Sequence, residues 1–140
     1  DDTAKKVFKI PMGPFELMNI TGIPIAYHST EGLGQKLGAF YRPSNCLKEQ
    51  FEKKTQWDLN GEIGSTKTDN VENRLLGTVF TVACNLADEG ISSIEDIDRG
   101  AKIGLRWRRG PFELMNKYGI ERSFEIVSKF VEKYQMLKIP

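Results

Sequence analysis

The sequence has few of the side chains on which most catalytic and metal sites depend. Among its 140 residues it has one histidine, His28, and two cysteines, Cys46 and Cys84, which form no Cys-x-x-Cys pair. Nucleophile–base triads and tetrahedral zinc sites need several such side chains close together. We therefore expect no triad, no metal site and no disulfide framework, and we expect a packed or solvated role for His28.

Three further absences narrow the function. No apolar run approaches the roughly 18 residues of a membrane-spanning helix, and residues 1–6 do not form a signal peptide. Lys and Arg number 20 against 19 Asp and Glu, for a net charge of +1, whereas nucleic-acid binders usually carry a large basic excess. No Gly-x-Gly-x-x-Gly follows a strand pattern, so no dinucleotide site is expected in this chain. The free cysteines favour a reducing compartment, which we take to be the cytoplasm.

An internal repeat organises the chain. Residues 13–19 read Gly-Pro-Phe-Glu-Leu-Met-Asn, and residues 110–116 read the same, an offset of 97 positions. The offset also pairs Asp1 with Asp98 and Gly22 with Gly119. In each copy Gly permits a tight turn, Pro suits the first position of a helix, and Glu favours the positive helix N-terminus. The repeat is read first as a structural entry into a helix, because only its Glu could react.

Helical spacing accounts for the second copy. Apolar residues recur at helical intervals over residues 71–89, and Gly90 is typical of a helix end. Ser92 and Ser93 are candidate caps for a short helix to about Ile103, and Pro111 begins another that Gly119 ends. A last helix over residues 121–134 has a predicted buried stripe, Phe124, Val127, Val131 and Tyr134. No segment requires a strand, so the predicted fold is all-α.

The repeat divides the chain into two helical units that we expect to pair about a pseudo-two-fold. Residues 1–60 form the first unit, residues 61–70 a polar linker and residues 71–140 the second unit. The long helix of the second copy has no counterpart in the first, because the chain starts at Asp1. We therefore expect a fragment whose first unit lacks its opening helix, leaving apolar surface near Phe15, Leu17 and Ile20 that favours self-association or cover by the second unit.

Residues of the second copy resemble a known family. The set is Val71-x-Asn73-Arg74-Leu75-Leu76, Glu89-Gly90, Ile94-Glu95-Asp96-Ile97-Asp98, Gly104, Gly110-Pro111-Phe112-Glu113-Leu114 and Gly119. Its order and spacing resemble the C-terminal helical domain of the L-3-hydroxyacyl-CoA dehydrogenases over about residues 71–120. Residues 1–60 resemble the later half of the same domain.

The resemblance implies a parent enzyme that joins this helical part to an N-terminal Rossmann domain. That domain would bind NAD and supply a His–Glu base, and the parent would oxidise 3-hydroxyacyl-CoA to 3-oxoacyl-CoA in fatty-acid β-oxidation. The helical part would close the substrate cleft and form the dimer. Tandem helical units resemble the multifunctional enzymes, some of which also carry an enoyl-CoA hydratase domain. The family's substrate-contacting Asn maps onto Asn73, the one candidate catalytic residue.

Two other functions remain open from the residues alone. The chain could be a non-catalytic helical interaction module that shares the fold. It could also bind nucleic acid through Arg106, Arg108 and Arg109, although the low net charge favours a solvated loop or a domain contact there. The implied dehydrogenase chemistry predicts that the isolated chain binds no NAD and is inactive.

Overall fold

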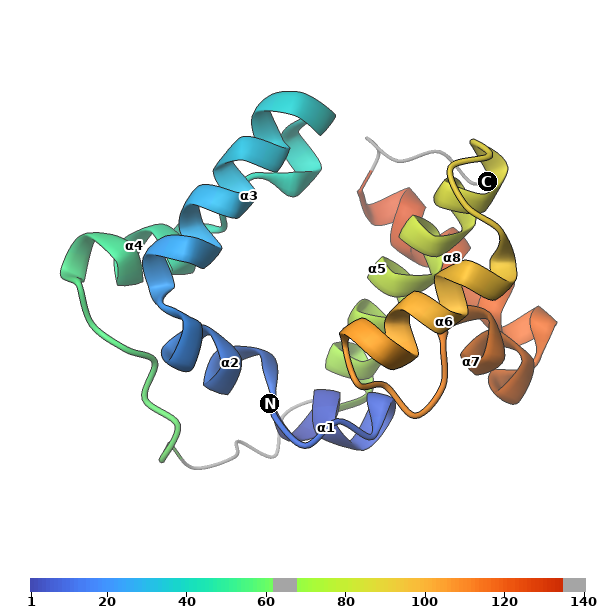
Figure 1. Ribbon diagram of the computed structural model, residues 1–140, viewed down its shortest axis with the longest axis horizontal. Coiled ribbons are helices and arrows are strands. Elements are labelled where there is room, and N and C mark those ends of the chain that lie inside the picture. The colour runs from blue at the N-terminus through green and yellow to red at the C-terminus, as the bar shows by residue number, and fades with distance from the viewer. Residues whose placement is uncertain (62–67, 135–140) are drawn as a thin grey trace. The chain divides into compact units, whose positions relative to one another are not determined.

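The computed structural model describes residues 1–61 and 68–134 as a set of helices (Figure 1). The helices are α1 (Asp2–Phe8), α2 (Pro14–Thr21), α3 (Ile23–Leu37), α4 (Asn45–Lys53), α5 (Thr68–Asp88), α6 (Ile94–Gly104), α7 (Pro111–Tyr118) and α8 (Ile120–Lys133), with a 3₁₀ turn η1 (Ala39–Tyr41). No strand occurs among the described residues, so the all-α prediction is confirmed. None of the described helices has the length and apolar character of a membrane span.

The chain divides into two compact units. The first unit comprises Asp1 and Met12–Gly64, and the second comprises Asp2–Pro11 and Ser65–Pro140. The sequence assigned all of residues 1–60 to one unit, whereas α1 packs against α5 in the second. The predicted linker, residues 61–70, lies largely outside the described residues, but its last part is helical because α5 begins at Thr68.

The two copies of the repeat build the same helix entry. In the second unit the carboxylate of Asp98 accepts the backbone N–H groups of Phe112 and Glu113 at 2.8 and 3.1 Å. In the first unit Asp1 accepts those of Phe15 and Glu16, again at 2.8 and 3.1 Å. These bonds satisfy N–H groups that have no partner within the helix. The repeat is therefore a structural element, as the sequence indicated.

The glycine of each copy is required by this contact. A Cβ built on Gly110 would lie 2.3 Å from Asp98 Oδ1, and one on Gly13 would lie 2.4 Å from Asp1 Oδ1. The glutamate then completes the entry, because the Gly110 N–H donates to Glu113 Oε2 at 3.2 Å and the Gly13 N–H to Glu16 Oε2 at 3.4 Å. The Gly-Pro-Phe-Glu sequence thus gives the capping aspartate access to the start of the helix.

The second unit has a continuous hydrophobic core. Its residues come from α1, α5, α7 and α8, namely Ala4, Val7, Phe8, Leu76, Phe80, Leu114, Met115, Ile126, Val127 and Val131. Leu76 and Phe80 of α5 are fully buried. Gly77 allows α5 to approach α8 closely, since a Cβ there would lie 2.8 Å from the Phe130 ring. The long helix α5 is therefore the central element of this unit.

The predicted stripe of the last helix is partly wrong. Val127 and Val131 are buried, but Phe124 is 62% exposed, and Phe130 is buried instead. Ser123 is also buried, with its hydroxyl donating to the Gly119 carbonyl at 2.9 Å. The buried face of α8 is thus rotated from the predicted one, because α5 packs against Phe130.

The first unit has a thinner core. Ile23 of α3 and Leu47 of α4 are its buried large apolar residues among those described. Tyr27 stacks on Phe51 with ring centroids 4.2 Å apart, which joins α3 to α4. Ser44 caps α4 by accepting the Leu47 N–H at 3.3 Å. Stacking of aromatic rings therefore contributes to the packing of α3 against α4.

Candidate functional site

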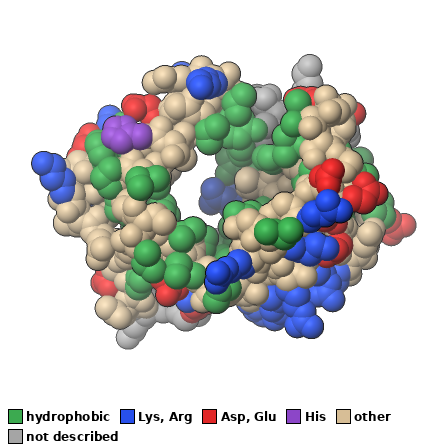
Figure 2. Space-filling model, in the orientation of Figure 1, with side chains coloured by type: hydrophobic (Ala, Val, Ile, Leu, Met, Phe, Trp, Pro, Cys, Tyr) green, Lys and Arg blue, Asp and Glu red, His purple; other side chains and the backbone are tan. Residues whose placement is uncertain are grey.

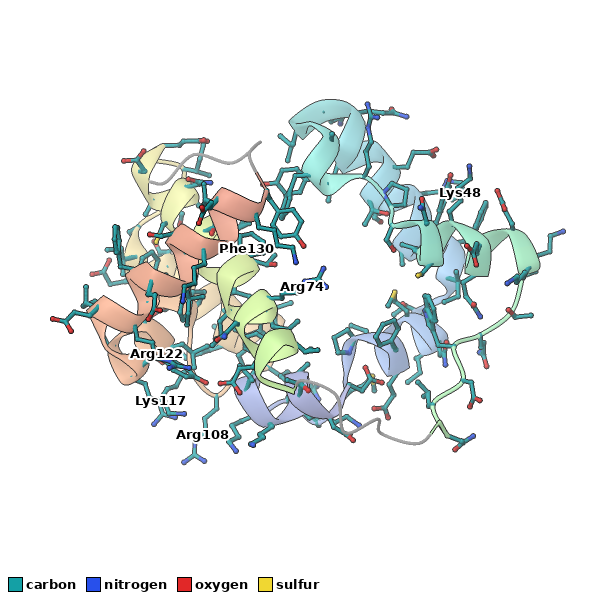
Figure 3. All side chains as sticks on the ribbon, turned by 180° about the vertical axis from the view of Figure 1, so that it is seen from behind. Lys48, Arg74, Arg108, Lys117, Arg122 and Phe130 are labelled. Carbon is teal, nitrogen blue, oxygen red and sulfur yellow. The ribbon has the colours of Figure 1, made fainter. Side chains whose placement is uncertain are left out.

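A groove lined by α5 and α8 holds the candidate residue Asn73. Its volume is about 240 Å³, and its lining residues are Asn73, Arg74, Arg122, Glu125, Ile126, Lys129, Phe130 and Lys133. Figure 3 shows Arg74 on α5 and both Arg122 and Phe130 on α8. Ile126 and Phe130 are buried and form an apolar floor. The groove therefore joins an apolar floor to a largely cationic rim.

Asn73 is an exposed residue of α5. Its side-chain amide makes no hydrogen bond to any described residue, so both its donors and its acceptor face the solvent. The neighbouring Arg74 is held in place, because its Nη2 donates to the hydroxyl of Tyr134 at 3.0 Å. Lys133 Nζ lies 5.8 Å from the centroid of the same Tyr134 ring. This end of the groove can therefore contact a polar or anionic ligand.

The carboxylate in the groove is paired with a lysine. Lys129 Nζ lies 2.6 Å from Glu125 Oε1, a pair one helical turn apart on α8. The hydrogen bond from Lys129 lowers the pKa of Glu125. A general base works best with a pKa near the operating pH, so a carboxylate shifted downward is poorly suited to take a proton. The described lining can position a ligand but holds no suitable base.

His28 is not part of this groove. It lies on α3 of the first unit, with a 61% exposed side chain and its Nδ1 3.5 Å from Glu31 Oε2. Its ring also packs edge-to-face against Phe51. No serine or cysteine is placed beside it in the described interactions. The expected solvated or packed role is therefore the one observed.

The basic loop after α6 packs on α1. Trp107 stacks on Phe8 with ring centroids 4.2 Å apart, and the Arg108 N–H donates to the Phe8 carbonyl at 3.2 Å. Lys and Arg side chains gather around α1 and this loop in Figure 2. The tryptophan is therefore part of the packing rather than a free surface on which a base could stack, which weakens the nucleic-acid interpretation.

The two cysteines form neither a disulfide nor a metal site among the described residues. Both are free: Cys46 is exposed, and Cys84 is half-buried beside Met115, with the two sulfur atoms 4.0 Å apart. Burial raises the pKa of the Cys84 thiol, which reduces its thiolate fraction at neutral pH. No group of three or more metal-ligating side chains occurs in the described parts of the chain.

Comparison with known families places both copies in one group. The model of the 3-hydroxyacyl-CoA dehydrogenase C-terminal domain matches residues 1–62 and 71–138. The chain belongs to this family. The resemblance of both copies to this domain is thereby confirmed.

Two curated relatives share part of the chain. The human mitochondrial hydroxyacyl-coenzyme A dehydrogenase is 37% identical over 62 residues, which are 44% of this chain and 20% of the relative. The pig mitochondrial hydroxyacyl-coenzyme A dehydrogenase is 36% identical over 62 residues, with the same coverage. The match thus spans about a fifth of the length of these relatives. No solved structure matches the chain significantly.

Two contacts of the structure were not found from the sequence. In the first unit Asn19 pairs with the backbone of Trp57, since its Nδ2 donates to the Trp57 carbonyl at 2.9 Å and its Oδ1 accepts the Trp57 N–H at 2.8 Å. In the second unit the Tyr118 hydroxyl donates to Glu72 Oε1 at 2.9 Å. The amide of Asn19 inside the repeat and the carboxylate of Glu72 on α5 were the available signals.

Proposed function

We propose that the chain is the helical part of an NAD-dependent L-3-hydroxyacyl-CoA dehydrogenase of fatty-acid β-oxidation. The parent enzyme would oxidise 3-hydroxyacyl-CoA to 3-oxoacyl-CoA, and this part would form one wall of the substrate cleft and the dimer contact. The observation that carries the proposal is the match of both repeat copies to the dehydrogenase C-terminal domain. The names of the human and pig relatives support the same activity.

The cofactor would be bound outside this chain. Dinucleotide sites place the pyrophosphate at a glycine-rich turn between a strand and a helix. The described residues are helical or loop and contain no such turn, so they do not fit NAD. A Rossmann domain of the parent chain is therefore the proposed partner, and the isolated 140-residue chain is expected to be inactive because hydride transfer needs a positioned cofactor.

Asn73 is the proposed substrate contact. Its exposed amide lies on a groove with an apolar floor and a cationic rim. This combination suits an acyl-CoA, whose acyl chain is apolar and whose coenzyme A part carries phosphates. An amide can donate to or accept from a substrate hydroxyl. It would orient the substrate rather than take a proton.

Other partners follow from the same proposal. An enoyl-CoA hydratase domain in the same polypeptide and self-association of the helical part are both expected of a multifunctional enzyme. The two free cysteines support the proposed cytoplasmic location, whereas both curated relatives are named mitochondrial. The alternative function is a non-catalytic helical interaction module.

The deciding experiment compares the 140-residue chain with the polypeptide encoded by its complete gene. NADH formation is followed with a 3-hydroxyacyl-CoA and NAD. We expect turnover by the complete polypeptide and none by the chain. If the complete polypeptide neither binds NAD nor turns over, the dehydrogenase proposal fails and the interaction module replaces it.

Two asparagine variants of the complete polypeptide test the role of Asn73. Losing one hydrogen bond made to the transition state, worth about 1.4 kcal/mol, lowers kcat/KM about tenfold. We expect this loss for Asn73→Ala. Asn116→Ala is the matched control, because Asn116 is an exposed residue of α7 outside the groove. Equal activities of the two variants would remove Asn73 from the site.

A further inference from the structure

Three cations lie toward one end of the groove formed by α5 and α8. Arg74 comes from α5, and Lys129 and Lys133 come from α8, where they are one turn apart, about 6 Å along the axis. A further cation of the lining, Arg122, lies two turns before Lys129, about 10 Å away along the same helix. Glu125 is the carboxylate among the described lining residues. Three positive charges against this one negative charge leave the end of the groove with a net charge of +2.

Tyr134 holds two of these cations close together. Its hydroxyl accepts a hydrogen bond from Arg74 Nη2 at 3.0 Å, and Lys133 Nζ lies 5.8 Å from the centroid of its ring. The same ring packs against Phe130, with centroids 4.8 Å apart. A cation over an aromatic ring is attracted to the face of that ring. Arg74 and Lys133 are therefore oriented before a ligand arrives, which lowers the entropic cost of binding.

The repeat shows that the fold does not require this arrangement of charge. The offset of 97 positions pairs Lys129 with Gly32 and Glu125 with His28. Helix α3 therefore forms without either member of the pair. Both side chains are mostly exposed, at 71% for Lys129 and 60% for Glu125, and exposed ion pairs contribute little to stability. The pair is thus a feature of the groove in the second unit and not of the helices that the two units share.

We propose that Arg74, Lys129 and Lys133 form a binding site for a phosphate monoester. Such a group carries nearly two negative charges at neutral pH and has three strong acceptor oxygens, which matches the net charge and the three cations of the site. The forked donors of Arg74 suit two phosphate oxygens at once. Ile126 and Phe130, the buried floor of the groove, would contact the organic part of the ester.

The charge of the site favours a monoester over a diester. A phosphate diester, as in a nucleic-acid backbone or in the diphosphate of NAD, carries one charge for each phosphorus atom and has no terminal phosphate group. A small phosphate ester and the 3′-phosphate of coenzyme A both have the required terminal group. The inference goes beyond the proposed function, and only coenzyme A as a source rests on that function.

The test is calorimetric titration of the 140-residue chain with phenyl phosphate, a small monoester with an apolar ring. The titration is done at low salt and about pH 7.5, above the second phosphate pKa of about 6. Because three charge-assisted hydrogen bonds are available, we expect saturable binding with a Kd of about 1 mM or below. Benzenesulfonate, which has a similar shape and a single charge, should bind about tenfold more weakly.

Charge variants locate the site. Lys129→Gln and Lys133→Gln should each weaken phenyl phosphate binding about tenfold, because each removes one charge-assisted contact. Glu125→Gln should strengthen binding, because it frees Lys129 from its ion pair, and loss of folding cannot produce a gain. Lys48→Gln is the matched control, since Lys48 on α4 is also exposed and its Nζ lies 3.9 Å from Glu52 one turn away. The control should bind like the wild type, and circular dichroism confirms that each variant is folded.

Four results would overturn the inference. Phenyl phosphate gives no saturable binding up to about 10 mM, or Lys129→Gln binds it as tightly as Lys48→Gln does. Glu125→Gln weakens binding, or benzenesulfonate binds as tightly as phenyl phosphate, which would mean that the site does not select a doubly charged group.

A comparison of coenzyme A with dephospho-coenzyme A identifies the source of the phosphate. Tighter binding of coenzyme A assigns the site to its 3′-phosphate, and equal binding of the two assigns the site to small phosphate esters. Dehydrogenase activity of the complete polypeptide is measured separately. Phenyl phosphate binding without that activity keeps the site and rejects the proposed function, whereas activity without phenyl phosphate binding rejects the site alone.

Discussion

The carboxylate of Asp98 accepts the backbone N–H of Phe112 at 2.8 Å, and it does so while only 7% exposed. A second bond, from the Glu113 N–H at 3.1 Å, uses the other carboxylate oxygen. The charge lies at the positive end of α7, which compensates for its burial. Asp98, which lies in the middle of α6, therefore fixes that helix to the start of α7.

Removing this cap should destabilise the second unit. We expect Asp98→Ala to lower the free energy of unfolding by about 2 kcal/mol, because two charge-assisted bonds to a helix N-terminus are lost. Urea denaturation measures the change. Asp88→Ala, at an exposed position, should stay within about 0.5 kcal/mol of wild type. Equal midpoints for the two variants would show that the cap contributes nothing.

Two phenylalanines of the second unit differ sharply in burial, and their replacement should differ in its effect on stability. Phe80 is fully buried on α5, and Phe124 is 62% exposed on α8. We expect Phe80→Ala to cost about 3–5 kcal/mol, and Phe124→Ala to cost less than about 0.5 kcal/mol. Thermal unfolding of both variants is the measurement. A large loss at Phe124 would mean that the buried face of α8 is the one the sequence predicted.

Two helical glycines should respond in opposite directions to alanine. A Cβ on Gly77 would lie 2.8 Å from the Phe130 ring, whereas one on Gly100 has no neighbour within 4 Å. Gly77→Ala is therefore expected to destabilise by about 1–3 kcal/mol through overpacking. Gly100→Ala should stabilise α6 by up to about 1 kcal/mol, the difference in helix propensity. If Gly77→Ala is also stabilising, α5 and α8 do not pack this closely.

Stability should fall at alkaline pH because of Tyr118. Burial, followed by the hydrogen bond to Glu72, raises the pKa of Tyr118 to about 12. Between the ordinary tyrosine pKa of about 10 and this value the native state retains a proton that the unfolded state has lost, so unfolding is increasingly favoured as pH rises. Tyr118→Phe should lose this part of the pH dependence. Denaturation midpoints at several alkaline pH values compare the two proteins, and identical slopes would place the Tyr118 pKa near its ordinary value.

Much of the fold could be predicted from local signals. Pro14 and Pro111 mark helix starts, Gly90 follows the end of α5, and Ser93 caps α6 by accepting the Asp96 N–H at 3.1 Å. These features depend on a few neighbouring residues, so the sequence suffices. Which side chains are buried in the two cores depends on contacts between residues far apart in the chain, so the sequence predicts the buried residues less well than the helix ends.

Three misses have physical causes. Helix α8 has aromatic residues on two sides, so spacing could not choose between Phe124 and Phe130 until α5 was placed. Trp57 lies in a loop, and its backbone pairs with the side chain of Asn19, a contact that produces no periodic pattern in the sequence. The short helix α1 joins the second unit through Phe8 and Trp107, a contact between residues far apart in the chain.

The candidate site was only partly accessible to sequence reasoning. The family motif pointed to Asn73, but the cationic rim contributed by α8 depends on how that helix is rotated against α5. The role of Asn73 in substrate binding stays a prediction.

Calorimetric titration of the 140-residue chain with NAD tests the central claim most directly. The account predicts no binding heat at NAD concentrations up to the millimolar range, because the described residues are helical and lack a strand-to-helix phosphate turn. The same titration of the complete polypeptide should give saturable binding. Micromolar binding of NAD to the 140-residue chain alone would contradict the assignment of the cofactor to another domain.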